Sequence, residues 1–150
     1  YPYNIMENLI PHIDVFLDNG YTKEEMKMIQ ESRKILHRDD LKVTATTVRV
    51  PVKFSHCVSI NIELEEEFDL KGIRTILSSY PGIIVKDDLK NLQYPMPIDV
   101  EGKDEVYVGR IRRDYSLDNG LNIWVVADNI RKGAATNAVQ IAQVLIEKED

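Results

Sequence analysis

The sequence has a single cysteine, no long apolar run and no excess of positive charge, and each shortage excludes a class of protein. Because Cys57 is the only cysteine among 150 residues, no disulfide framework can form within the chain, which is typical of a reducing compartment. No apolar run approaches the roughly 20 residues of a membrane helix. No basic segment followed by an apolar stretch indicates a signal peptide. We therefore expect a cytoplasmic protein with no membrane partner.

The charge balance also argues against a nucleic-acid partner. The formal net charge is -6, whereas a nucleic-acid binder usually carries a basic patch. Hydrophobic residues make up 43% of the chain and charged residues 29%, which is ordinary for a globular protein. The length predicts one domain, residues 1–150, with a real core.

Several catalytic signatures are missing. The sequence contains neither a GxGxxG fingerprint nor a Walker loop. The three histidines, His12, His37 and His56, lack metal-ligand spacing, so we expect no metal site. Cys57 follows His56 directly, and neighbours in an extended chain point to opposite faces, so the two are poorly placed to form a nucleophile and its base. The chain has a candidate base and candidate anion-binding groups, but no convincing nucleophile.

The most informative segment is RVPVKFSHC, from Arg49 to Cys57. In a continuous strand, Arg49 and His56 would lie roughly 23 Å apart. If they share a site, the chain bends near Pro51 to Ser55, and proline favours such a break. An arginine that binds a carboxylate or phosphate, beside a histidine that titrates near neutral pH, would form half of an active site. The alternative is an arginine on the polar side of a strand and a structural histidine.

Sequence patterns predict an α+β protein, with helices on one face of a mixed or antiparallel sheet. Thr22 and Glu25 form a capping box at the start of the first helix. Residues 58–64 alternate apolar and polar side chains, as in a strand with one buried face. The residues 118–120 are typical of a hairpin turn. We expect helices at about 23–37, after the cap Asp69 until Pro81-Gly82 stops it, and at about 133–147. We expect strands at 43–50, 58–64, 83–85, 106–113 and 121–127, and a long loop at 86–103.

Two further groups of residues are candidates for ligand binding. Glu24 and Lys27 lie on one face of the first predicted helix, where they could bind an ammonium group and a phosphate, or form a solvated helix face. Asn129 follows Asp128 at a strand end, ahead of a helix start rich in small residues. An asparagine there can present its amide to a ligand, or the two residues can serve simply as a helix cap.

These groups match one family in order and spacing. The chain resembles the C-terminal domain of aspartate-semialdehyde dehydrogenases, and the resemblance covers nearly all 150 residues. It rests on the stretches YNIMENLIPHID, YTKEEMKM, TATTVRVPVKFSHC, YVGRIRRD and WVVADNIRKGAATNAVQIAQVL. The resemblance implies the fold of a glyceraldehyde-phosphate-dehydrogenase-like C-terminal domain, whose sheet forms a homodimer contact. It also implies that the closing helix packs on a nucleotide-binding domain.

The resemblance further implies site roles. His56 corresponds to the catalytic acid/base, and Arg49 to the residue that binds the substrate carboxylate. Glu24 corresponds to the residue near the substrate amino group, and Lys27 to the phosphate-binding lysine. Asn129 corresponds to a contact with the NADP cofactor. One departure is Ser55, since the family often has glycine before the histidine.

The implied reaction converts aspartate semialdehyde and phosphate reversibly into aspartyl phosphate, a step in lysine, threonine and methionine biosynthesis. A cysteine attacks the aldehyde, hydride leaves to NADP, and phosphate cleaves the resulting thioester. The family's glycine-rich loop and nucleophilic cysteine have no counterpart in this chain. We therefore expect the chain to belong to a longer protein and to be inactive alone. The alternatives are a dimerisation module without chemistry and a sensor domain that binds an acidic amino acid.

Overall fold

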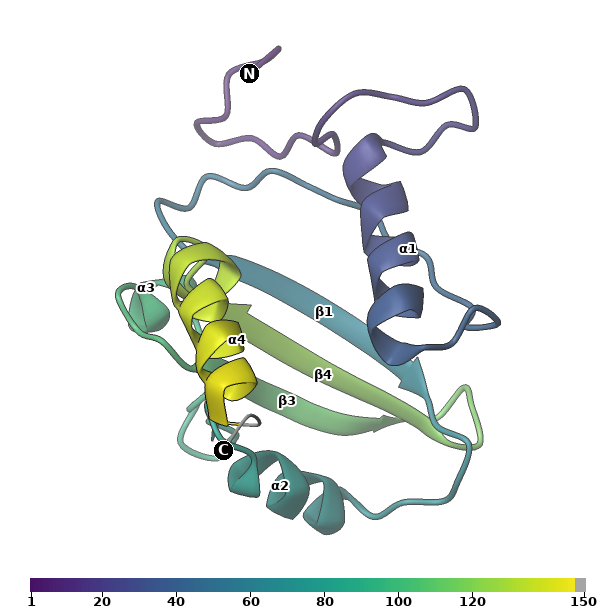
Figure 1. The fold of residues 1–150 in the computed structure, drawn as a ribbon, viewed down its shortest axis with the longest axis vertical. Coiled ribbons are helices and arrows are strands. Elements are labelled where there is room, and N and C mark those ends of the chain that lie inside the picture. Colours follow the sequence, from purple (N-terminus) through teal and green to yellow (C-terminus); the bar gives the residue numbers. More distant parts are fainter. Residues whose placement is uncertain (148–150) are drawn as a thin grey trace. The chain divides into compact units, whose positions relative to one another are not determined.

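The computed structural model describes residues 1–147, and their contacts divide the chain into two compact units (Figure 1). The first unit is Tyr1–Val52, and the second begins at Lys53. Within the described part of the chain, no helix combines the length and the apolar character that crossing a bilayer would require.

The first unit is built around helix α1, Lys23–Leu36. The predicted capping box is confirmed: the Glu25 N–H donates to the Thr22 hydroxyl, and the Thr22 N–H donates to the Glu25 carboxylate. His37 ends the helix in the left-handed region, at φ 53°. The helix buries Ile29 as its apolar contact. The helix predicted at about 23–37 is therefore confirmed, and it ends at Leu36, one residue earlier than predicted.

The strand predicted at 43–50 is wrong. Its residues have no strand partner in the described chain beyond one isolated bridge between Arg49 and Ile10. β-branched residues favour an extended backbone, but a strand also needs a neighbour with which to exchange hydrogen bonds. Besides that bridge, side chains hold the segment: the Thr47 N–H donates to Glu25 Oε1 at 2.8 Å, and the hydroxyls of Tyr21 and Thr44 lie 3.2 Å apart.

The second unit contains a mixed four-stranded sheet in the order β1-β4-β3-β2. Strand β4 pairs antiparallel with both β1 and β3, and β2 pairs parallel with β3. The expected α+β class and mixed sheet are confirmed. The strands are β1 (His56–Glu63), β2 (Ile83–Val85), β3 (Val106–Asp114) and β4 (Gly120–Ala127).

One face of this sheet is covered by helix α2, Leu70–Ser79, which the Asp69 side chain caps. Because strand residues alternate between faces, Val108, Ile111 and Leu121 become the buried centre of this layer. Ile73 and Leu77 of α2 pack against that centre. This is the hydrophobic core that the period-two pattern of 58–64 indicated.

The opposite face carries a smaller apolar cluster under the long loop. That loop contains a short helix, α3 (Pro97–Val100), which the sequence did not predict. Val100 is fully buried against Tyr107 and Val126. The Trp124 indole N–H donates to the Pro95 carbonyl at 3.0 Å. Close approach requires glycine in β3, because a Cβ at Gly109 would lie 2.3 Å from a backbone oxygen.

The closing helix begins earlier than predicted. A π-helical turn, η1 (Arg131–Ala135), leads into α4 (Thr136–Glu147). None of its described residues is buried, and Val139, Ile141 and Val144 are between 50% and 59% exposed. The predicted packing of this helix on another domain stays a prediction.

Candidate functional site

His56 opens β1 beside the last residue of β4. In the strand register it pairs with Ala127, the residue immediately before Asp128 and Asn129. Its side chain is exposed, and its imidazole has no hydrogen-bond partner within residues 1–147. The register therefore brings two of the predicted site residues, His56 and Asn129, to one corner of the sheet.

A tight backbone turn precedes the histidine. Ser55 has a φ of 74°, a left-handed conformation that non-glycine residues seldom adopt. It is buried, its N–H donates to Asn129 Oδ1 at 3.0 Å, and its hydroxyl donates to the Pro97 carbonyl at 3.2 Å. These bonds offset the strain of the turn. The extended backbone is also broken before Ser55, where the Val52 N–H donates to the Val50 carbonyl at 2.8 Å.

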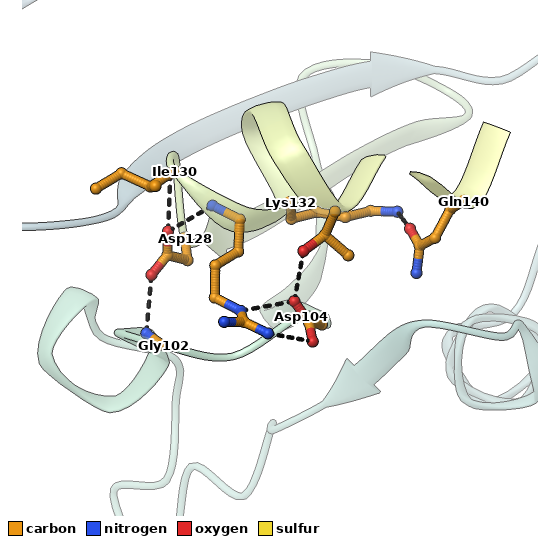
Figure 2. Close-up of polar contacts among 8 residues, drawn as sticks. Gly102, Asp104, Asp128, Ile130, Lys132 and Gln140 are labelled. Atoms are coloured by element: carbon orange, nitrogen blue, oxygen red, sulfur yellow. Dashed lines mark hydrogen bonds and ion pairs between the residues drawn. The ribbon is translucent and has the colours of Figure 1, made fainter. Parts of the chain in front are cut away.

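The turn from β4 into η1 is organised by a buried carboxylate. Asp128 accepts hydrogen bonds from the N–H groups of Ile130 at 2.8 Å, Arg131 at 2.9 Å and Gly102 at 2.8 Å (Figure 2). These N–H groups, with that of Arg131 first, lower the pKa of the Asp128 carboxyl. Asp128 thus fixes the turn that leads into η1, and the neighbouring Asn129 amide reaches Ser55.

A second carboxylate, that of Asp104, binds the side chains of the same turn. Asp104 forms a two-pronged ion pair with Arg131, with both N–O distances 2.7 Å, and accepts the Thr136 hydroxyl at 2.7 Å (Figure 2). The Arg131 guanidinium, followed by the Thr136 hydroxyl, lowers the pKa of Asp104 from an ordinary 3.8 to about 2. Nothing in the sequence pattern singled out Asp104, because its partners lie 27 and 32 residues away.

We expect acid to weaken the second unit through Asp104. A carboxyl whose folded pKa is lowered stabilises the fold fully above its unfolded pKa, and that stabilisation is lost as the pH falls through the folded pKa. The window therefore runs from near 3.8 down to about 2. Thermal unfolding followed from pH 7 to pH 2 should show Asp104→Asn less stable than wild type at pH 7, with the gap closing in this window.

The matched control is Asp118→Asn, in the exposed hairpin turn. It also removes one negative charge, but the ion pair of Arg131 is with Asp104 and not with Asp118. The difference in thermal stability between Asp118→Asn and wild type could close over the same pH range. A general charge effect would then explain the result, and the assignment to Asp104 would be wrong.

Cys57 is poorly suited to act as a nucleophile. It lies on the sheet face opposite His56, packed against the cluster of Val100, Tyr107 and Val126. Burial raises the pKa of its thiol, and a thiol, unlike a thiolate, is a weak nucleophile. The sequence-based argument that Cys57 and His56 are not a catalytic pair agrees with this geometry.

The other three predicted site residues belong to the first unit. Lys27 Nζ lies 3.7 Å from the Glu24 carboxylate on the exposed face of α1. Arg49 is fixed through its main chain, which exchanges hydrogen bonds of 2.8 and 3.1 Å with Ile10. Its guanidinium lies 4.9 Å from the Tyr1 ring centroid and pairs with no carboxylate in the described chain. This leaves the guanidinium able to bind an external carboxylate or phosphate.

The described residues include no group of three or more His, Cys, Asp or Glu side chains that could hold a metal ion. They do offer a polar group for an organic cofactor. Asn129 Oδ1 accepts the Ser55 N–H. The NH₂ group of the same amide has no hydrogen-bond acceptor within residues 1–147 and can donate to a ligand carbonyl.

The chain is similar over nearly its whole length to known enzymes. It is 55% identical over 148 residues to the aspartate-semialdehyde dehydrogenase of Aquifex aeolicus, covering 99% of this chain and 44% of that one. A structure of aspartate semialdehyde dehydrogenase II from Vibrio cholerae, complexed with ASA, matches with a TM-score of 0.93 at 45% identity, over 98% of this chain and 43% of that one.

A more distant structure, the Candida albicans aspartate semialdehyde dehydrogenase with NADP, matches with a TM-score of 0.76 at 26% identity, over 97% of this chain and 46% of that one. The chain therefore spans less than half the length of these relatives. The family model for the semialdehyde dehydrogenase dimerisation domain matches residues 1–132. The resemblance found in the sequence is confirmed, and the chain belongs to the semialdehyde dehydrogenase dimerisation-domain family.

Proposed function

We propose that this chain is the substrate-binding and proton-transfer part of an NADP-dependent aspartate-semialdehyde dehydrogenase. The reaction converts aspartate semialdehyde and phosphate reversibly into aspartyl phosphate. The similarity to named aspartate-semialdehyde dehydrogenases over 99% of the chain supports this proposal. The cysteine nucleophile and the nucleotide-binding loop lie in the remainder of such an enzyme.

The observation that carries the proposal is the bond between Asn129 Oδ1 and the N–H of Ser55, 3.0 Å long. It joins the residue before the candidate acid/base, His56, to the amide that would contact the cofactor. Because the His56 imidazole is exposed at the strand end, it can accept a proton from a nucleophile and return it later. An imidazole can both accept and donate a proton, which suits both directions of a reversible reaction.

The first unit would bind the charged groups of the two substrates. We assign the substrate carboxylate to Arg49, since a guanidinium can donate two parallel hydrogen bonds to it. Glu24 would lie near the substrate ammonium group and Lys27 would bind phosphate. The exposed ion pair between them, 3.7 Å long, is weak and can open when both ligands arrive.

NADP, when bound, supplies the hydride acceptor. From this chain, the NH₂ group of Asn129 would hold it, because the carbonyl oxygen of that amide is already occupied. The buried Asp128 and the Asp104–Arg131 pair keep the turn that carries Asn129 in place.

The substrate assignment predicts a selective binding defect. In the complete dehydrogenase, Arg49→Ala should raise the KM for aspartate semialdehyde about 10- to 100-fold, the loss expected for hydrogen bonds between charged groups. The KM for NADP should stay unchanged, and steady-state kinetics with each substrate varied in turn measures both.

Lys42→Ala is the matched control, because Lys42 is an exposed cation of the same extended segment. It removes one positive charge and should leave both KM values close to wild type. Equal KM values for Arg49→Ala and wild type would contradict the assignment of Arg49 to the carboxylate.

The family to which the chain belongs is named for dimerisation, and we propose that the complete enzyme is a homodimer. The single cysteine is consistent with a cytoplasmic location.

A further inference from the structure

The Glu25 carboxylate connects two parts of the first unit. It is 7% exposed, and its Oε2 accepts the Thr22 N–H at 2.8 Å, which closes the capping box. Its Oε1 accepts the Thr47 N–H at 2.8 Å and lies 3.4 Å from the Thr47 hydroxyl. A capping box needs only the first of these bonds. The bonds to Thr47 serve another purpose.

Thr47 is part of the extended segment that has no strand partner. It precedes Arg49 by two residues, so the segment is fixed at Thr47 by Glu25 and at Arg49 by the main chain of Ile10. Glu25 lies between Glu24 and Lys27 in the first turns of α1. One buried carboxylate therefore joins the helix that carries Glu24 and Lys27 to the segment that carries Arg49.

We propose that Glu25 is a positioning residue, which sets Arg49 against Glu24 and Lys27 so that both ends of the substrate and the phosphate are bound together. Glu25 itself faces the protein and would not touch a substrate, because both of its oxygens are occupied by main-chain N–H groups. This role rests on the proposed function, since it concerns the spacing of the same substrate-binding groups.

Glu25→Gln in the complete dehydrogenase tests the role. Glutamine has one carbonyl oxygen and one NH₂ group, so it can accept from Thr22 or from Thr47, and its NH₂ then faces the other N–H donor. We expect the KM for aspartate semialdehyde and for phosphate to rise about tenfold, as for the loss of one charge-assisted hydrogen bond. The KM for NADP should stay within about twofold of wild type.

Thr22→Ala is the matched control. It removes the hydroxyl that caps the same helix but leaves the bonds from Glu25 to Thr47. It should lower thermal stability, with both KM values for the substrates near wild type. Amide hydrogen exchange gives a readout that does not depend on activity: exchange at Thr47 should accelerate in Glu25→Gln and stay slow in Thr22→Ala.

The outcomes separate this inference from the proposed function. If Glu25→Gln and Thr22→Ala change the substrate KM values equally, Glu25 is only a helix cap and the inference is overturned. Unchanged exchange at Thr47 in Glu25→Gln overturns it as well. If the wild-type enzyme does not turn over aspartate semialdehyde, the proposed function fails, and the positioning role fails with it.

Discussion

Replacing His56 by alanine in the complete dehydrogenase should lower kcat by about 10²- to 10⁴-fold, the contribution typical of a general acid–base. The imidazole stands exposed at the start of β1 without a hydrogen-bond partner in residues 1–147, so it is available to a reacting group. Its main chain is fixed by the preceding residue, Ser55, through Asn129. We expect the loss mainly in kcat, because a proton carrier acts in the transition state more than in substrate binding.

The neighbouring Cys57 provides the control. Cys57→Ser changes the adjacent residue, on the other face of the sheet, and should leave kcat within about twofold of wild type because no step uses its thiol. Normal kcat in His56→Ala, in an enzyme that is folded and dimeric, would refute the acid/base role.

The 150-residue chain by itself should produce no NADPH from aspartate semialdehyde, phosphate and NADP. The proposed mechanism needs a thiolate, and removal of a nucleophile costs several orders of magnitude in rate or all of the activity. Cys57 cannot replace it, because burial raises the pKa of its thiol and its sheet face is opposite to that of His56. A continuous spectrophotometric assay of NADPH absorbance at 340 nm measures this directly. We expect the rate of NADPH formation to equal that of the uncatalysed reaction.

Calorimetry on the same sample separates the remaining alternative, a sensor domain for an acidic amino acid. Titration with aspartate and, separately, with phosphate, on wild type and Arg49→Ala, reports binding without chemistry. Tight aspartate binding by the isolated chain would favour the sensor, and steady NADPH formation by it would disprove our expectation of inactivity.

Local sequence signals predicted most of the secondary structure correctly. The capping box of Thr22 and Glu25 located α1, the alternation after His56 located β1, and the Asp118–Gly120 turn located the hairpin between β3 and β4. These signals are local, since a helix cap or a period-two pattern depends on residues a few positions apart. The strand predicted at 43–50 was wrong because a strand also needs a neighbouring strand with which to exchange hydrogen bonds. A local sequence pattern does not reveal whether that neighbour is present.

The polar contacts around the site were harder to predict. Glu25 was recognised as a cap, but its bond to Thr47 spans 22 residues. Ser55 was noted only as a departure from the family's glycine, and its bond to Asn129 spans 74 residues. Asp104 carried no signal at all. Such pairs have no fixed spacing in the chain, so nothing in a single sequence marks them.

The sequence by itself determined the family, the class of fold and the candidate roles of Glu24, Lys27, Arg49, His56 and Asn129 as proposals, because residue types in order carry that information. Only the tertiary structure showed which other groups keep these residues in position. The register of β1 with β4 brings His56 beside Ala127, and the buried Glu25 and Asp128 use their oxygens on distant main-chain N–H groups. A buried carboxylate must find its donors wherever the fold supplies them, and that requirement is met in three dimensions, not along the chain.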